Sequence, residues 1–449
     1  MRVIETPAFQ RLRNIKHLGL AYLVFPGADF SRFSHSLGAC HVMGRTLVSL
    51  QHRYPTQISD NDVQLYRLAA LLHDVGHYPF SHAMEYAVKD YYTGLYTTSQ
   101  TTHTAPEPNL QDDQPFDHER AGKEVVVADG RIREAVANAG FAPESVPAIF
   151  MHENVEKFAN LLSSDLDADR VDYLLRTAHH TGLPYGNVDL DYMVSQLRLD
   201  RDGNVCLAPK ALRAADHFLL GRYFDYQQVA FHKTVAALEL LLKDVLRTLL
   251  ADGYVECSAG WVKQAIATGE WCTFDDAFVW QKMRELADST TDEVIRIKTK
   301  AILERRPPKL VWQSEFLGAS SGSPRNQFKT LNKLLTRSVS DLAAHFGIDR
   351  ALWDVWTQDG LALTKIGGQL SVSRAMASTE DDLHRFEQVL RIFEPTTQGS
   401  RPVVEMEQSL MHVLSNYAYY AIRLYVTLPP EYESRREEIE TYIGSQLEN

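Results

Sequence analysis

Histidine and aspartate residues with the chemistry of metal ligands gather in the first part of the chain. Most of the 17 histidines precede residue 181 of the 449 residues. Imidazole nitrogen and carboxylate oxygen are ligands that iron, manganese and similar divalent ions accept, and a metal with an open coordination position activates water. The candidate ligands lie in four segments: RFSHSLGACH with His35, LLHDVGH with His73 and Asp74, FDHE with His118, and DLDADRVDY with Asp167, Asp169 and Asp172.

A predicted amphipathic helix over residues 62–74 must position the His-Asp pair. Its apolar side chains lie largely on one face, and Ser59 or Asp60 is suited to cap its start. His73 comes at the end of this helix, where a ligand is shielded from water. His77 follows four residues later, which is one helical turn if the helix persists.

The remaining pattern predicts a helical N-terminal domain, residues 1–318, and a smaller mixed C-terminal region, residues 319–449. Gly76 and Pro79 interrupt the helix that carries the His-Asp pair. Residues 91–115 are rich in Thr, Gln, Pro and Asp, which is typical of a loop, and their place between histidine motifs makes them a candidate lid. GASSGSPRNQ reads as a linker, residues 232–250 as a helix, and the run ending in YVTL as a strand.

The composition is that of an ordinary soluble protein, with 45% hydrophobic and 23% charged residues. No run of eighteen or more apolar residues and no signal peptide is evident, so we expect no membrane span. The four cysteines are far apart, which favours a reducing compartment, and we expect the cytoplasm. The formal charge of −12 argues against a non-specific DNA coat.

Five blocks of sequence resemble the HD-domain superfamily in its deoxynucleoside triphosphate triphosphohydrolase branch, over about residues 5 to 310. They are RLRNIKHLGLAYLVFPGADFSRFSHSLG, LLHDVGHYPFSH, FDHE, DADRVDYLLRTAHHTG and GRYFDYQQVAFHKT. The resemblance implies a mainly α fold, with an HD-domain helical core and a smaller α+β C-terminal region. It also implies a divalent metal, whether Fe, Mn, Mg, Zn or Ni, held by His35, His73, Asp74 and Asp169.

The same resemblance implies a phosphate-binding shell of Arg32, His77, His82, His118, Arg170, Tyr173 and Arg222. Guanidinium groups bind phosphate oxygens in bidentate geometry, and histidines move protons near neutral pH. We expect His77 to be the leading acid/base group, with His82 and His118 assisting. Members of this branch commonly form dimers, tetramers or hexamers, so a homo-oligomer is expected by analogy.

Three positions depart from the branch, and all three belong to its sugar site. The branch has a glutamine at His17 and an aspartate at Thr177, which hold the sugar 3′-hydroxyl, and a tyrosine at Ala230, which packs on the sugar. We assign the sugar and base pocket to His17, Leu18, Thr177 and Ala230. The loss of the tyrosine ring and of the aspartate predicts a wider pocket with altered sugar recognition.

These features predict an enzyme that hydrolyses a nucleoside triphosphate or a related nucleotide by metal-activated water. Two other functions compete with it. The first is a nuclease or phosphodiesterase acting on single-stranded nucleic acid, which the acidic net charge opposes. The second is a non-catalytic nucleotide sensor, which the intact metal positions oppose.

Overall fold

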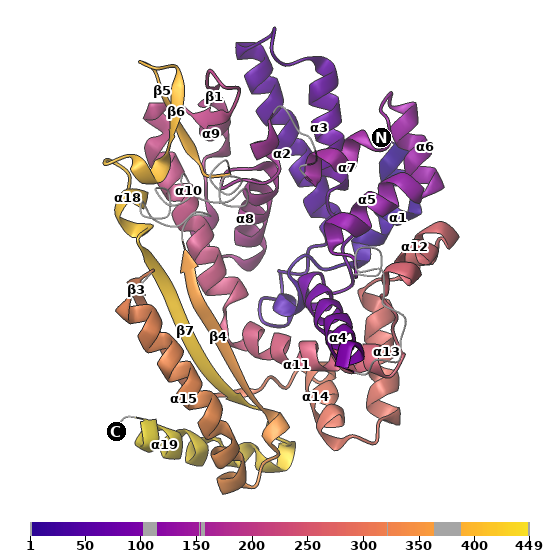
Figure 1. The fold of residues 1–449 in the computed structure, drawn as a ribbon, viewed down its shortest axis with the longest axis vertical. Coiled ribbons are helices and arrows are strands. Elements are labelled where there is room, and N and C mark those ends of the chain that lie inside the picture. The colour runs from indigo at the N-terminus through magenta and orange to yellow at the C-terminus, as the bar shows by residue number, and fades with distance from the viewer. Residues whose placement is uncertain are drawn as a thin grey trace.

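The computed structural model describes residues 2–101, 115–151, 153, 158–320, 322–362 and 388–447, and it is mostly helical (Figure 1). The helices are α1 (Pro7–Gln10), α2 (Arg32–Arg53), α3 (Asp60–Leu72), α4 (His82–Thr101), α5 (His118–Ala128), α6 (Gly130–Asn138), α7 (Ser145–Phe150), α8 (Ala168–Thr181), α9 (Leu190–Ser195), α10 (Leu212–Asp225), α11 (Lys233–Ala251), α12 (Ala259–Thr268), α13 (Asp276–Ser289), α14 (Glu293–Leu303), α15 (Ser323–Phe346), α18 (Met411–Leu414) and α19 (Arg436–Leu447). The strands are β1 (Leu197–Leu199), β2 (Val205–Leu207), β3 (Lys309–Ala319), β4 (Trp353–Ala362), β5 (Arg391–Glu394), β6 (Gly399–Pro402) and β7 (Tyr417–Val426).

Two apolar cores hold the chain together. The larger core lies among the helices of the first 300 residues and includes the fully buried Leu47, Leu72 and Phe218. The smaller core lies between the long C-terminal strands and helices α15 and α19, and includes Trp353 and Tyr420. This architecture confirms the predicted fold class, a mainly α fold with a smaller α+β C-terminal region.

The long strands form a three-stranded sheet with β7 in the middle, antiparallel to both β3 and β4. Helix α15 contacts all three strands and α19 contacts β3, so one face of the sheet is covered by helices (Figure 1). A second sheet has the order β1-β2-β5-β6. It joins strands from both sides of residue 318, and the domain division proposed at that residue stays a prediction.

Helix α3 has a capped start, and its end positions the His-Asp pair. Ser59 caps the helix in a reciprocal capping box with Asp62, as the sequence indicates. The helix ends at Leu72, before the interruption that Gly76 and Pro79 predict, so His77 does not follow His73 by one turn of the same helix. The following residues form a turn instead, and α4 begins at His82.

This turn is strained and is held by a buried carboxylate. Phe80 and Ser81 have positive φ values of 55° and 56°, which non-glycine residues rarely adopt. Asp276, at the start of α13, accepts hydrogen bonds from the backbone N–H groups of Phe80 at 2.7 Å and Lys16 at 2.9 Å. The turn therefore has its geometry imposed by an element almost two hundred residues away in the sequence.

Two loop predictions need correction. The segment 91–115 is not a loop throughout, because α4 continues to Thr101; residues 102–114 lie outside the described residues, and the lid stays a prediction. The segment 318–327 is not a linker, because it contains the end of β3 and the start of α15. Within the described part of the chain, no helix combines the length and the apolar character needed to cross a bilayer.

Candidate metal centre and nucleotide cavity

One cavity of about 350 Å³ collects most of the predicted site residues. The predicted residues that line it are His17, Leu18, Arg32, His73, Asp74, His77, His82, His118, Asp169, Arg170, Tyr173 and Ala230. His35 is fully buried behind the wall of the cavity. Thr177 and Arg222 are not among the described residues that line it.

The four predicted metal ligands converge from α2, the end of α3 and the start of α8. The Nε2 atom of His35 lies 3.0 Å from Oδ1 of Asp169 and 3.8 Å from Oδ2 of Asp74. The Nε2 atom of His73 lies 3.3 Å from Oδ1 of Asp74 and 3.9 Å from Oδ1 of Asp169. Donor atoms of His35, His73 and Asp169 all lie within 4.8 Å of one another, which suits a single cation.

The hydrogen bonds of the two histidines show that the site fits a divalent metal. Nδ1 of His35 donates to Asp172 at 2.8 Å, and Nδ1 of His73 donates to the carbonyl of Ala70 at 2.8 Å. Each proton on Nδ1 leaves a lone pair on Nε2. Both Nε2 atoms are buried, and neither makes a hydrogen bond of acceptable geometry among the described residues. Two aimed lone pairs beside two carboxylates are the ligand chemistry of iron, manganese or zinc.

The charges around the site keep its carboxylates ionised. Burial alone would raise the pKa of Asp74, but Arg32 and the histidines at positions 73 and 77 hold it well below its usual range. The Arg32 Nη1 atom lies 2.7 Å from Oδ2 of Asp74. Burial opposes the charge on His35, yet the nearby carboxylates of Asp169 and Asp172 raise its pKa to about 10. The imidazole of His35 therefore keeps a proton that a metal ion would have to displace. Low pH should for this reason oppose metal binding.

Asp172 orients the ring of His35. The close packing of α2 on α8 brings the two residues together. A Cβ at Gly38 would lie 1.7 Å from Oδ1 of Asp172, so only glycine permits this approach. Arg176, one turn along α8, donates to both oxygens of Asp172 at 2.8 and 2.9 Å. The carboxylate therefore fixes the ring of His35 from behind the metal site.

Asp172→Asn is expected to weaken metal binding by about 10- to 100-fold, the usual effect of losing the partner of a ligating histidine. The physical reason is that an amide no longer fixes the tautomer and orientation of the His35 ring. Titration of metal against a chelator measures the affinity. The exposed Asp288→Asn on α13 is the matched control, and an unchanged affinity in Asp172→Asn would refute the orienting role.

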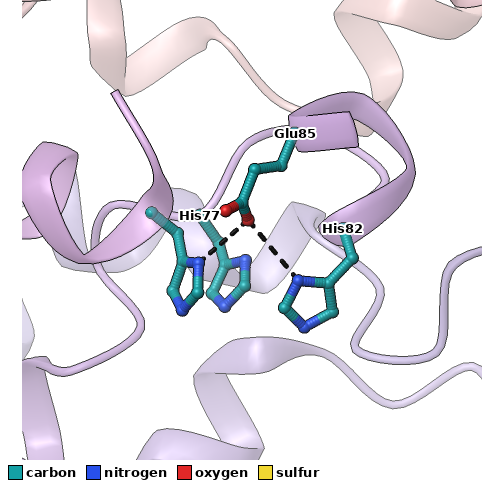
Figure 2. Close-up of side chains that lie close together, drawn as sticks. His77, His82 and Glu85 are labelled. Atoms are coloured by element: carbon teal, nitrogen blue, oxygen red, sulfur yellow. Dashed lines mark hydrogen bonds and ion pairs between the residues drawn. The ribbon is translucent and has the colours of Figure 1, made fainter. Parts of the chain in front are cut away.

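A second cluster lies beside the metal ligands and contains His77, His82, Glu85 and His118. Figure 2 shows Glu85 beside His77 and His82, with its carboxylate directed at imidazole nitrogens. Oε2 of Glu85 lies 2.9 Å from Nδ1 of His118 and 3.4 Å from Nδ1 of His82. The His118 ring stacks on His77 with a centroid distance of 4.1 Å. All three predicted catalytic histidines therefore lie together.

Gly76 explains how His118 reaches this cluster from a distant part of the sequence. A Cβ at Gly76 would lie 2.1 Å from the backbone nitrogen of Gly122 and 2.2 Å from the carbonyl oxygen of His118. The turn after the His-Asp pair therefore packs directly on the backbone of α5. A side chain at Gly76 would push His118 away from His77.

The environments of the three histidines differ and give them different protonation states. Burial, followed by Arg32 and His118, lowers the pKa of His77 well below its usual value, so its ring is neutral near pH 7. Burial opposes the charge on His118, but the Glu85 carboxylate raises its pKa. Despite burial, His118 and His82 lower the pKa of Glu85 to about 2. The pair of His118 and Glu85 suits proton donation better than the buried His77.

The predicted phosphate-binding residues do not form one equivalent set. Arg170 and Tyr173 line the cavity; Arg170 lies 3.5 Å from carboxylate oxygens of both Asp165 and Asp167, longer than the 3.0 Å pair of Arg222. Arg32 also lines it but bonds Asp74 and Ser81. Arg222 lies outside the lining and pairs with the buried Asp165 at 3.0 Å. Arg170 is therefore the guanidinium best placed to receive an anion.

The residues predicted to form the sugar pocket lie partly at the cavity wall and partly in the protein core. His17, Leu18 and Ala230 line the cavity, but Thr177 is fully buried, and its hydroxyl donates no hydrogen bond to the described residues. His17 lies next to the metal ligands, with its ring centroid 4.4 Å from that of His35. The prediction that Thr177 borders the sugar is thus not matched by its position.

Glu85, Glu119, Asp225 and Tyr226 are among the cavity or site residues that escaped the sequence reasoning. Glu85 follows His82 by three residues, so it shares a helix face with it once α4 is known to begin at His82. Asp225 and Tyr226 begin a π-helical turn, Tyr226–Ala230, which no periodicity in the sequence predicts. No sequence feature other than its position next to His118 would have identified Glu119.

The buried carboxyl of Asp225 is expected to make stability depend on pH. Burial, against the Tyr185 hydrogen bond and Arg222, raises its pKa from 3.8 to about 7. The carboxyl thus contributes full stability below pH 3.8 and loses it as the pH rises through 7. We expect Asp225→Asn to be stabilised relative to the parent by on the order of 2–4 kcal/mol at pH 8 and little at pH 4. Denaturant unfolding at pH 4 and pH 8 measures the difference in free energy of unfolding between the variant and the parent. An equal difference at the two pH values would contradict the prediction.

Comparison with known protein families places a recognised domain on these elements. The model of the HD domain family matches residues 32–139, which contain His35, His73, Asp74 and His118. The match confirms the resemblance that the sequence blocks indicate. Asp169 comes from α8, beyond the matched residues.

Two curated relatives illustrate the range of similarity. The uncharacterised protein YwfO of Bacillus subtilis is 32% identical over 258 residues, which are 56% of this chain and 53% of the relative. The human deoxynucleoside triphosphate triphosphohydrolase SAMHD1 is 27% identical over 317 residues, which are 64% of this chain and 47% of the relative. The chain thus spans about half the length of the curated relatives it matches.

Two solved structures share the fold over nearly the whole chain. A phosphohydrolase from Bacteroides thetaiotaomicron has a TM-score of 0.64 at 21% identity and covers 94% of each chain. A hypothetical protein from Aquifex aeolicus has a TM-score of 0.60 at 23% identity, covering 98% of this chain and 94% of its own. At these identities the likeness establishes the fold.

Proposed function

Because an HD domain occupies residues 32–139 of this chain, we propose that the protein is a metal-dependent phosphohydrolase that cleaves a nucleoside triphosphate or a related nucleotide. One observation carries the proposal: the two buried Nε2 lone pairs of His35 and His73 converge with two carboxylates at the wall of an open cavity. The human relative SAMHD1, a deoxynucleoside triphosphate triphosphohydrolase, supports the substrate class.

His35, His73, Asp74 and Asp169 would hold the metal, whether it is Fe, Mn, Mg, Zn or Ni. When bound, such an ion lowers the pKa of water and polarises the phosphoryl group. The chain's own residues do the rest. Arg170 and Tyr173 face the cavity and receive the phosphate oxygens, which carry about four negative charges in a triphosphate. Arg32 keeps Asp74 ionised and oriented.

The second cluster supplies proton transfer. His118, kept protonated by Glu85, donates to the leaving oxygen, and the exposed His82 shares the same carboxylate. His77 is neutral and lies between the two clusters, with its Nε2 3.2 Å from Asp74 and its ring under His118. We therefore propose that His118 with Glu85 acts as the acid and that His77 has a positioning role.

Sugar recognition is proposed to differ from that of deoxynucleotide-specific relatives. Ala230 lines the cavity where the branch has a tyrosine ring, and Thr177 is buried away from it. The widened pocket supports a substrate with a larger or modified sugar. A cytoplasmic homo-oligomer is the state in which we propose that the enzyme acts.

A hydrolysis panel with Mn²⁺ tests the proposed function. Each ribo- and deoxynucleoside triphosphate and a single-stranded oligonucleotide are incubated separately, and products are separated by chromatography. We expect triphosphates to be hydrolysed and ribonucleotides to be accepted, since no tyrosine blocks the sugar. Exclusive use of unmodified deoxynucleotides would contradict altered sugar recognition, and cleavage of the oligonucleotide alone would make the protein a nuclease.

A further inference from the structure

A buried carboxyl group at the cavity wall has no part in the chemistry described so far. Asp225 is only 7% exposed, yet it lines the cavity together with Tyr226 and Ala230. The residue belongs neither to the metal ligands nor to the histidine cluster around Glu85. Its position is on the wall formed by the end of α10 and the turn that follows.

The backbone of this turn brings Asp225 and Ala230 to the same wall. The N–H of Phe231 donates to the carbonyl oxygen of Tyr226 at 2.7 Å, a bond across five residues that defines a π-helical turn. Such turns widen the helix by one residue and are frequent at functional sites. Asp225 directly precedes the turn and Ala230 ends it, and both residues line the same cavity.

One oxygen of Asp225 is fixed by the protein, and the other is free to bind. The Tyr185 hydroxyl donates to Oδ1 of Asp225 at 2.7 Å. No hydrogen bond to Oδ2 comes from any residue in the described ranges. Asp225 lines the cavity, so a substrate hydroxyl can donate a hydrogen bond to this second oxygen.

We propose that Asp225 is the specificity-determining residue of this cavity, accepting a hydrogen bond from the 2′-hydroxyl of a ribonucleoside triphosphate in the space that Ala230 leaves open. The inference rests on the proposed function and names its substrate class. Thr177 cannot take this role because it is buried outside the cavity lining. Ala230 provides room but no polar atom.

The test compares matched ribo- and 2′-deoxynucleoside triphosphates with wild type and Asp225→Asn. Asparagine keeps an oxygen acceptor for Tyr185, so the fold is retained, but it replaces the second acceptor with an N–H donor. We expect the ratio of kcat/KM for the ribo over the deoxy substrate to fall about 10- to 100-fold. The loss should fall on the ribonucleotide, and a 3′-deoxynucleotide should behave as the ribonucleotide does. Asp288→Asn is the control for a generic loss of charge.

Tyr185→Phe keeps the carboxyl and removes only its hydrogen bond, so it should lower the same ratio by a smaller factor. Thermal unfolding of each variant verifies that it is folded. Hydrolysis with an unchanged ratio in Asp225→Asn would overturn this inference and leave the phosphohydrolase standing, as would wild-type activity on deoxynucleotides alone. No hydrolysis of any nucleotide by the metal-loaded wild type would overturn both.

Discussion

His73→Ala is expected to lose its bound metal and to hydrolyse nucleotides at least ~1000-fold more slowly than wild type. His73 supplies one of two aimed Nε2 lone pairs, and its Nδ1 is tied to the Ala70 carbonyl, so no neighbour can replace it. Metal per chain is measured by elemental mass spectrometry after dialysis, and hydrolysis is measured on the same samples.

The exposed Asp288→Asn serves again as the control that should keep both metal and activity. Wild type treated with a chelator should match His73→Ala in rate, and added metal should restore the wild type but not the variant. If His73→Ala keeps its metal and its activity, the assignment of the ligands is wrong. If it loses the metal and remains fully active, the reaction does not depend on this site.

Glu85→Gln is expected to lower kcat by about 100- to 10 000-fold, the usual contribution of general acid catalysis, while the metal content stays at the wild-type level. Glutamine keeps the shape of Glu85 but cannot hold a proton on His118 through a charged bond of 2.9 Å. KM should change little, because Glu85 is separate from Arg170 and Tyr173. Steady-state kinetics beside metal analysis distinguish this result from loss of the metal.

The same substitution should shift the pH profile in a defined direction. Glu85 raises the pKa of His118 in the wild type, so removing its charge lowers that pKa. An acid that must be protonated then loses its proton at lower pH, and the alkaline limb of kcat should move to lower pH. A lower kcat with an unmoved alkaline limb would show that Glu85 has a structural role alone.

The sequence predicts which candidate ligands come together because most of them lie at element ends that local rules define. Ser59 caps α3 as expected, and the helix delivers His73 and Asp74 at its end. Asp169 opens α8, capped by Asp167. The structure brings these ligands together with His35 from α2, as the resemblance implies.

The rest of the candidate site depends on contacts between residues far apart in the sequence, which no local sequence pattern predicts. His118 reaches His77 only because Gly76 packs on the backbone of α5. Arg222 is neutralised by Asp165, 57 residues away, so its predicted contact with phosphate is not matched by its position. The π-helical turn that places Asp225 beside Ala230 has no signature in the hydrophobic periodicity, and Thr177 is turned into the core by the packing of α8.

The most direct measurement of the central claim is hydrolysis of nucleoside triphosphates by the same protein sample without metal and after reconstitution with Mn²⁺. Products are resolved by ion-exchange chromatography, and bound metal is determined on each sample. The proposed site predicts about one high-affinity metal ion per chain, with nucleoside and phosphate products formed only in the reconstituted sample. A sample that binds the metal at this site and forms no product from any triphosphate would contradict a phosphohydrolase.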